Sequence, residues 1–301
     1  MKLNIKSVGK VDSAGITLDS ISVIAGYNGS GKTTISKCLY GMLELTREKK
    51  LDKEIVKTYW KNLFANQMAT FGRDELDQIS LDGDNFSLSL LREGNKELEI
   101  RKKGKADNET IYLRSPSRWS DWFSDKLKVE LEKPLVQESS ELLLKYMDIL
   151  DSNASGYLKK TDSGYVYVDE DFPEQDIALD NTASGIMIFL ELSRLIGNGT
   201  IKPNSTLIID EPETNLHPEK QVALARVLTR LSSQMNIKMF LSSHNIYFIR
   251  ALEVALQEEE IGNYHFYSMK KDPDTHLYSS QDVTDNLEII YDDLYRPMEE
   301  L

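Results

Sequence analysis

The stretch from Gly26 to Thr33 reads Gly-Tyr-Asn-Gly-Ser-Gly-Lys-Thr and matches the phosphate-loop pattern G-x-x-x-x-G-K-[ST]. The apolar run 21–25 before it predicts a buried strand, and residues 32–48 after it predict a helix. Glycines let backbone N–H groups curl around phosphates at the positively polarised N-terminus of such a helix. The sequence therefore predicts a nucleoside triphosphate site on a strand–loop–helix unit.

The residues of this loop have distinct expected roles. Lys32 is expected to place its charge on the β- and γ-phosphates, and Thr33 is expected to offer its hydroxyl to Mg²⁺. For Tyr27 two interpretations stay open: its ring lies against the base or ribose, or it packs against the lobe. The expected nucleotide-binding residues are Gly26, Tyr27, Asn28, Gly29, Ser30, Gly31, Lys32, Thr33 and Thr34.

A second motif, Leu207-Ile208-Ile209-Asp210-Glu211, has the pattern of a buried strand that ends in two carboxylates. At the carboxyl end of that strand, Asp210 is expected to hold Mg²⁺ directly or through water. Glu211 is expected to orient and deprotonate the attacking water. Together with the phosphate loop, these carboxylates predict hydrolysis of the bound triphosphate.

The segment from Asp210 to Pro218, Asp-Glu-Pro-Glu-Thr-Asn-Leu-His-Pro, resembles the D-E-P-E-x-x-L-H-P signature of ABC-type ATPases of the SMC, Rad50 and RecF group. Leu-Ser-Ser-His-Asn at 241–245 fits the same group. The similarity is greatest to the ATPase domain of the overcoming-lysogenisation-defect (OLD) family and to ATPase subunits of related antiviral systems. The resemblance implies ATP and Mg²⁺ as ligands, and His244 as the switch residue that contacts the γ-phosphate. Lys32, Glu211 and His244 are thus the expected catalytic residues.

The same resemblance implies a signature segment that caps the γ-phosphate in a second subunit. The candidate is Asn-Thr-Ala-Ser-Gly at 181–185, where Ala183 stands in the place of the family's phosphate-binding serine. Thr182 or Ser184 would therefore have to replace that serine, and Ser184 and Gly185 are the expected contacts. A second departure is the missing glutamine near Mg²⁺, because Ser115-Pro116-Ser117-Arg118 holds none and Gln67 is a weak alternative.

The expected fold class is α/β, a P-loop ATPase of the ABC type with a mixed or parallel sheet, an antiparallel β subdomain and a helical lobe. Residues 1–116 and 201–301 are expected to form the two parts of the nucleotide-binding lobe, the first with the antiparallel strands. Residues 117–200 are expected to form the mainly helical lobe with the signature-like segment. Periodicity predicts a helix over 51–76 and alternating strands over 79–100.

Composition excludes several other classes of protein. The 301 residues carry 36 basic and 49 acidic side chains, and the net charge of −13 repels phosphate backbones and anionic lipids on average. Cys38 is the one cysteine, which excludes a disulfide framework and a thiolate metal cluster. With no signal-peptide pattern and no apolar run of membrane-span length, we expect a cytoplasmic chain without membrane contact. The net-positive stretch from Arg92 to Lys105 has two interpretations, a solvated hairpin tip or a nucleic-acid contact.

These features predict an ATP-dependent switch. The chain is expected to form an ATP-dependent homodimer or higher even oligomer, to hydrolyse ATP slowly and to control a separate effector such as a nuclease. The residues after His244 are too few for the Toprim nuclease of the OLD family, so we expect any cleavage of nucleic acid on another chain. A role in prokaryotic antiviral defence follows from the resemblance alone. The alternative is a RecF-like sensor of DNA ends or DNA repair, whereas the divergent signature segment disfavours a transporter motor.

Overall fold

A single large sheet organises the chain. The computed structural model describes residues 1–64, 76–93, 97–114, 122–136, 140–162 and 164–299, and in these ranges the sheet has eleven strands in the order β6-β5-β4-β1-β2-β14-β13-β3-β12-β11-β7. Its strands are β1 (Lys2–Val8), β2 (Val11–Thr17), β3 (Ile21–Ala25), β4 (Leu76–Asp82), β5 (Ser87–Glu93), β6 (Glu99–Lys103), β7 (Thr110–Arg114), β11 (Thr206–Asp210), β12 (Lys238–Ser243), β13 (Tyr264–Lys271) and β14 (Tyr278–Asp282).

The parallel part of this sheet runs through β13, β3, β12, β11 and β7. Its strands are apolar on both faces, as parallel strands covered by helices on each side require. Ile209 and Leu241 face a core shared with the helices α4 to α7, whereas Ile208 and Phe240 face a second core that contains α1 and α2. The two cores hold the parallel strands in place from both faces. The phosphate loop and the Asp210–Glu211 pair lie at the carboxyl ends of these strands.

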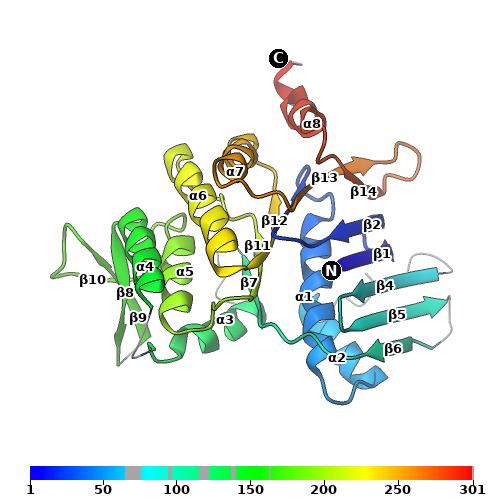
Figure 1. Cartoon of the computed structure of the whole chain (residues 1–301), viewed down its shortest axis with the longest axis horizontal. Coiled ribbons are helices and arrows are strands. Elements are labelled where there is room, and N and C mark those ends of the chain that lie inside the picture. The colour runs from blue at the N-terminus through cyan, green and yellow to red at the C-terminus, as the bar shows by residue number, and fades with distance from the viewer. Residues whose placement is uncertain (65–75, 94–96, 115–121, 137–139, 163, 300–301) are drawn as a thin grey trace.

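The helices cover the two faces unequally (Figure 1). In the view of Figure 1, α4 to α7 lie to the left of the parallel strands, α1 and α2 lie beside the antiparallel strands, and α8 stands at the top. The helices are α1 (Lys32–Arg47), α2 (Lys53–Leu63), α3 (Trp122–Glu132), α4 (Glu141–Ala154), α5 (Met187–Gly197), α6 (Pro218–Met235), α7 (Ile246–Glu258) and α8 (Glu288–Glu299).

The antiparallel strands β1, β2 and β4 to β6 extend the same sheet rather than forming a separate one. Their side chains alternate between a core face and a solvent face, as in other half-buried antiparallel sheets. On β1, Leu3 and Ile5 are buried in the core with α1, whereas Lys2 and Lys6 are exposed. The outer face is therefore an open, polar surface.

The helical lobe also contains a small second sheet. Strands β8 (Gly156–Thr161), β9 (Gly164–Asp169) and β10 (Asp176–Ala178) form an antiparallel ladder beside α4 and α5 (Figure 1). A short 3₁₀ turn, Leu179–Asn181, then leads into the signature-like segment. In sequence, this turn therefore connects the small sheet to the signature-like segment.

One secondary-structure prediction was wrong in its extent. The helix expected over 51–76 is α2, which begins after the N-cap Asp52 and ends at Leu63. Leu76 instead begins β4, because that segment pairs with β1 and places Ile79 and Leu81 in the core. Gln67 and the segment Ser115–Arg118 lie outside the described residues, so the predictions for them stay open.

Across the described ranges, none of the helices combines the length and the apolar character that a transmembrane span needs.

Candidate nucleotide site

The phosphate loop joins β3 to α1 and uses glycine where a side chain would not fit. Gly31, at the N-cap of α1, has a φ of 100°, and a Cβ there would lie 2.7 Å from Val11 Cγ2. Gly29 has a φ of 77°. No side chain caps the N-terminus of α1, so its first N–H groups are left for another partner. Such a helix start is a ready anion site.

Lys32 is buried inside this loop. Its Nζ donates hydrogen bonds to the carbonyl oxygens of Gly26 at 2.7 Å and Tyr27 at 3.1 Å, and lies 3.8 Å from Glu211 Oε1. Burial lowers the pKa of Lys32, and the neighbouring carboxylates oppose that shift. The hydrogen bonds hold the Lys32 ammonium group within the phosphate loop, where it can bind an anion.

Thr33 and Asp210 form an oxygen-rich pair beside Lys32. The Thr33 hydroxyl donates a 2.8 Å hydrogen bond to Asp210 Oδ2, and Ser242 donates to Asp210 Oδ1. Tyr112 donates to Asp210 Oδ2 at 3.5 Å, and Arg114 Nε lies 4.0 Å from that oxygen. These contacts hold the 2 % exposed Asp210 at the end of β11.

Glu211 and His244 form an ion pair beside the loop. Glu211 has a φ of 55°, in the left-handed region, and its Oε1 lies 3.2 Å from His244 Nδ1. The close contact with His244 lowers the pKa of Glu211, and the same contact raises the pKa of His244. At neutral pH, Glu211 is therefore a carboxylate, which is the form that can accept a proton.

A cavity of about 360 Å³ opens in front of these residues. It is lined by Gly9, Lys10, Gly29, Gly31, Lys32, Thr33, Thr34 and Glu211. Beside it, the buried Ser30 Oγ has no hydrogen-bond partner within the described part of the chain. The neighbouring hydroxyl of Thr33 and carboxylate of Asp210 are hard oxygen ligands of the kind that Mg²⁺ prefers. The residues present thus fit a triphosphate with its magnesium ion.

The signature-like segment does not line that cavity. Ser184 accepts a 2.9 Å hydrogen bond from Asn215 Nδ2, and a Cβ on Gly185 would lie 2.2 Å from the Asn215 carbonyl oxygen. The segment therefore packs on the loop between β11 and α6. Gly185 is required by this close backbone approach, and the exposed Ser184 remains at the surface.

Tyr27 points to the C-terminal helix. Its hydroxyl donates to the backbone oxygen of Asp293 in α8, and its side chain is partly exposed. Asp293 also accepts from Lys270 and, at 3.4 Å, from Ser268 on β13. This contact supports the interpretation in which Tyr27 packs against the lobe.

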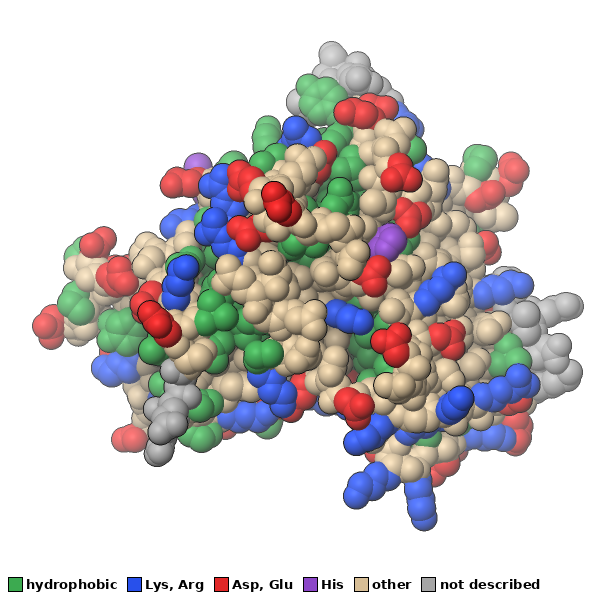
Figure 2. Space-filling model, viewed as in Figure 1, with side chains coloured by type: hydrophobic (Ala, Val, Ile, Leu, Met, Phe, Trp, Pro, Cys, Tyr) green, Lys and Arg blue, Asp and Glu red, His purple; other side chains and the backbone are tan. Residues whose placement is uncertain are grey.

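The basic stretch from Arg92 to Lys105 is divided between two faces of the sheet. Arg92 pairs with the buried Asp77 at 2.9 Å, and Lys102 donates to the backbone oxygen of Glu48. Arg101 and Lys103 lie on the solvent face, in register with Asn4 and Lys2 of β1 through β4 and β5. Figure 2 shows Lys and Arg side chains gathered over α2 and the antiparallel strands (lower right).

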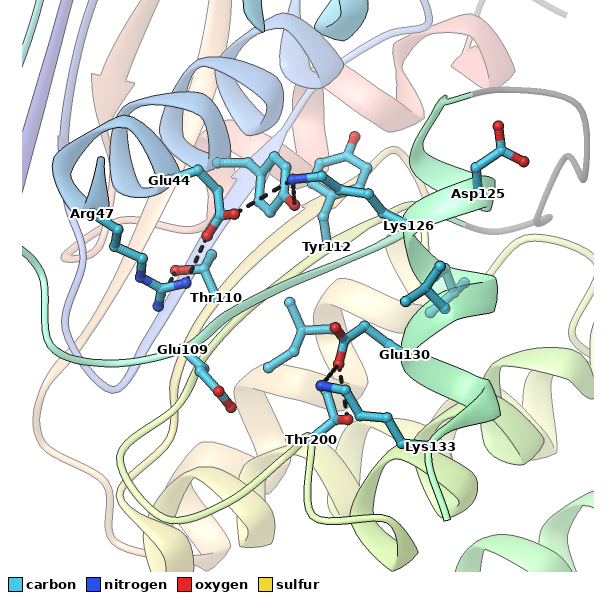
Figure 3. Close-up of a pocket in the computed structure, with 14 residues that line it drawn as sticks. Glu44, Arg47, Glu109, Thr110, Tyr112, Asp125, Lys126, Glu130, Lys133 and Thr200 are labelled. Atoms are coloured by element: carbon cyan, nitrogen blue, oxygen red, sulfur yellow. Dashed lines mark hydrogen bonds and ion pairs between the residues drawn. The ribbon is translucent and has the colours of Figure 1, made fainter. Parts of the chain in front are cut away.

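A second cavity, of about 460 Å³, lies between α1, β7 and α3 (Figure 3). Lys126 stands over the rings of Tyr40 and Tyr59 and lies 3.5 Å from Glu44, which also pairs with Arg47. The positive charges of Lys126 and Arg47 in this cavity are thus balanced by the carboxylate of Glu44. Thr110 and Tyr112 of β7 line this cavity, and Tyr112 also donates to Asp210, so the cavity lies next to the nucleotide site but shares no lining residue with the cavity at Lys32.

Comparison with known proteins agrees with this geometry. Residues 174–249, about a quarter of the chain, match the AAA ATPase domain family. No curated protein matches the chain significantly. The SMC head domain from Thermotoga maritima superposes with a TM-score of 0.55 at 12% identity, over 94% of this chain and 98% of that one. The chain has an SMC head-like fold.

Two further solved structures show the same likeness. An SMC head bound to the C-winged helix domain of ScpA has a TM-score of 0.55 and 10% identity, over 96% of this chain and 98% of that one. An SMC head with an extended coiled coil, bound to the C-terminal domain of ScpA from Pyrococcus furiosus, has a TM-score of 0.55 and 9% identity, over 99% and 98%. The predicted fold class is confirmed.

Several residues of the site were not predicted from the sequence. Arg114 and Ser242 lie directly beside Asp210 because β7, β11 and β12 are neighbours in register. Lys10 reaches the cavity from the turn between β1 and β2. All three are polar residues at or just after the end of a strand. Such a position predicts a site residue only when the order of the strands in the sheet is known.

Proposed function

We propose that this chain is a Mg²⁺-dependent ATPase. One observation carries the proposal: three separate segments bring together Lys32, Thr33, Asp210, Glu211 and His244, and Lys32, Thr33 and Glu211 line a single cavity. A structural salt-bridge network would not need the glycine loop and the uncapped helix N-terminus beside it. A triphosphate site explains all these features together.

Each residue has a task in this proposal. Bound Mg²⁺ would neutralise phosphate charge, with Thr33 and Asp210 as the residues that hold it. Lys32 and the N–H groups at the start of α1 bind and orient the phosphates. Glu211, ionised at neutral pH, orients a water molecule and accepts its proton. His244 holds Glu211 through its 3.2 Å contact and adds a donor near the γ-phosphate.

We further propose that ATP joins two copies of the chain, as in the SMC, Rad50 and RecF group. Ser184 and Gly185 lie outside the cavity lining of their own chain, so a second copy would supply them to that cavity. By the same resemblance, the dimer or higher even oligomer switches a separate effector such as a nuclease. The resemblance to the OLD family favours prokaryotic antiviral defence.

The decisive experiment measures both ATP turnover and the molecular mass of the protein in solution. The purified protein should hydrolyse Mg-ATP, and Glu211→Gln should lower kcat at least about 100-fold while leaving nucleotide binding intact. Light scattering with Mg-ATP should then show a dimer of Glu211→Gln. Lys32→Ala, which loses the phosphate contact, is the control and should stay monomeric. Unchanged turnover in Glu211→Gln would overturn the catalytic assignment, and a monomer would overturn the dimer.

A second candidate function, a RecF-like DNA sensor, is favoured by one specific feature. Lys2 and Lys6 of β1 lie on the same open face as Arg101 and Lys103 of β6, among polar side chains such as Ser80 and Ser89 and the carboxylates Asp82 and Glu99. A flat polar face flanked by cations suits a phosphate backbone.

A further inference from the structure

Glu213 is a buried carboxyl in the loop between β11 and α6. The residue is 2 % exposed, and its Oε1 accepts hydrogen bonds from Ser243 Oγ at 2.6 Å and from the His244 N–H at 3.4 Å. Its Oε2 is buried with no hydrogen-bond partner among the described residues. Burial raises the pKa of Glu213, and the bond from Ser243 opposes that rise. Burying a carboxyl oxygen without a hydrogen-bond partner costs folding free energy, so its presence here calls for an explanation.

The hydrogen bonds of Glu213 reach the junction where β12 becomes α7. Ser243 Oγ, which donates to Glu213, also accepts from the Asn245 N–H at 3.0 Å. Asn245 in turn caps α7, since its Oδ1 accepts from the N–H groups of Tyr247 at 2.8 Å and Phe248 at 3.2 Å. His244 lies between these two anchors, so its backbone position depends on them.

The imidazole of His244 has little other support. Its side chain is 38 % exposed, and its Nδ1 lies 3.2 Å from Glu211 Oε1 and 4.0 Å from Glu213 Oε1. Because the ring stands at a partly open surface, its orientation toward Glu211 is set mainly by where the backbone holds Cα. Glu213 is the side chain that fixes this backbone from the opposite loop.

We propose that Glu213 is a positioning residue for His244, and that its acceptor oxygen, bonded to Ser243 Oγ and the His244 N–H, keeps the imidazole beside Glu211. This inference rests on the proposed ATPase function, in which Glu211 and His244 act together. Displacement of a catalytic group by about 1 Å from a change outside the reacting atoms lowers rates by roughly 100-fold. Glu213 itself does not touch the reacting atoms in this scheme.

Two substitutions separate positioning from chemistry. Glu213→Gln keeps an acceptor oxygen of the same reach, so it should retain kcat within about 3-fold of the wild type. Glu213→Ala removes the acceptor and should lower kcat by roughly 10- to 100-fold, with KM for ATP nearly unchanged because the phosphate loop is intact. Glu219→Ala is the matched control, since Glu219 is an exposed glutamate at the start of α6.

A spectroscopic readout makes the test independent of turnover. The chain has 4 histidines, so ring ¹⁵N spectra can be assigned with His244→Gln. The Nδ1 signal of His244, which lies 3.2 Å from Glu211 Oε1, should have the same chemical shift in the wild type and Glu213→Gln, and should move in Glu213→Ala. Where Glu213→Ala does not fold, Ser243→Ala removes the same hydrogen bond from the other side and should behave alike.

The outcomes are distinct. Wild-type kcat and an unchanged His244 signal in Glu213→Ala would overturn the positioning role. Equal loss in Glu213→Gln and Glu213→Ala would also overturn it, because the carboxyl itself would then be needed. If the wild type does not hydrolyse ATP, the proposed function fails, yet the nitrogen spectra still decide whether Glu213 holds His244.

Discussion

Thr33 and Asp210 are 177 positions apart in the chain, yet the Thr33 hydroxyl donates a 2.8 Å hydrogen bond to Asp210 Oδ2. Thr33 is the second residue of α1 and Asp210 ends β11, two elements that pack against each other through the apolar core. The pairing of a hydroxyl and a carboxylate at that distance creates the oxygen pair that a magnesium ion would require.

Asp210→Asn should remove metal-dependent turnover. The amide keeps the shape of the side chain but loses the charge that attracts Mg²⁺, so we expect ATP hydrolysis to fall at least about 100-fold. Turnover measured across a magnesium titration checks this, with the unfolding midpoint as the control for a folded variant. A variant that reaches wild-type turnover at saturating magnesium would show that Asp210 is not a needed ligand.

The pair of Glu211 and His244 should make stability depend on pH. The pKa of His244 is raised from 6.5, so its contribution is full below about pH 6.5 and is lost as pH rises through the raised value. The pKa of Glu211 is lowered from 4.5, so its contribution is present above about pH 4.5 and is lost as pH falls through the lowered value. The pair therefore stabilises the fold most between these limits, by roughly 0.5–1 kcal/mol because both side chains are partly exposed.

Urea unfolding of the wild type and His244→Gln checks this pH window. The difference in unfolding free energy should be measurable at pH 5.5 and should shrink well above neutrality. The same variant serves at both pH values, so packing changes cancel. An equal difference at both pH values would contradict an ion pair.

Gly185→Ala should disturb the loop that follows β11. A Cβ there would lie 2.2 Å from the Asn215 carbonyl oxygen, and backbone cannot yield as a flexible side chain can. We expect a loss of roughly 1–3 kcal/mol in unfolding free energy and a lower ATP turnover. Gly262→Ala is the matched control, because no heavy atom of the described residues, apart from the chain neighbours of Gly262, lies within 4 Å of a Cβ at that position. Equal stability of the two variants would refute the close packing.

Charge reversal on the antiparallel sheet tests the DNA-sensor alternative. In that alternative, Arg101→Glu with Lys103→Glu should weaken binding of double-stranded DNA at low salt, because both side chains lie on the open face. Lys102→Glu is the internal comparison, since Lys102 lies on the other face and donates to Glu48. Salt-dependent binding that the double variant does not alter would leave this face without a nucleic-acid role.

Local sequence patterns predicted much of the fold and the centre of the site. The phosphate loop, the acidic end of β11 and the helix after Gly185 each depend on neighbouring residues, so their periodicity and spacing identify them. The SMC head-like class follows from these elements. The individual roles of Lys32, Glu211 and His244 stay predictions that the experiments above address.

The features of the fold and the site that the sequence did not predict depend on contacts between segments far apart in the chain. Arg114 meets Asp210 only because β7 lies beside β11 in register. Leu76 belongs to a strand because it pairs with β5, while residues 78–82 of the same strand pair with β1, which is far away in sequence. The two faces of β6 separate Arg101 from Lys102, which a net charge summed along the chain cannot distinguish.

The loop between β11 and α6 contacts both the signature-like segment and the end of β12. Asn215 contacts Ser184 in the signature-like segment, and Glu213, two residues earlier, contacts Ser243. In the proposed dimer, each signature-like segment serves the cavity of the other copy. Nucleotide bound in one cavity would then bias His244 of the neighbouring copy, and linkage makes such an influence reciprocal. Hydrolysis by the pair would rise sigmoidally with ATP concentration, so that the two copies act as one unit.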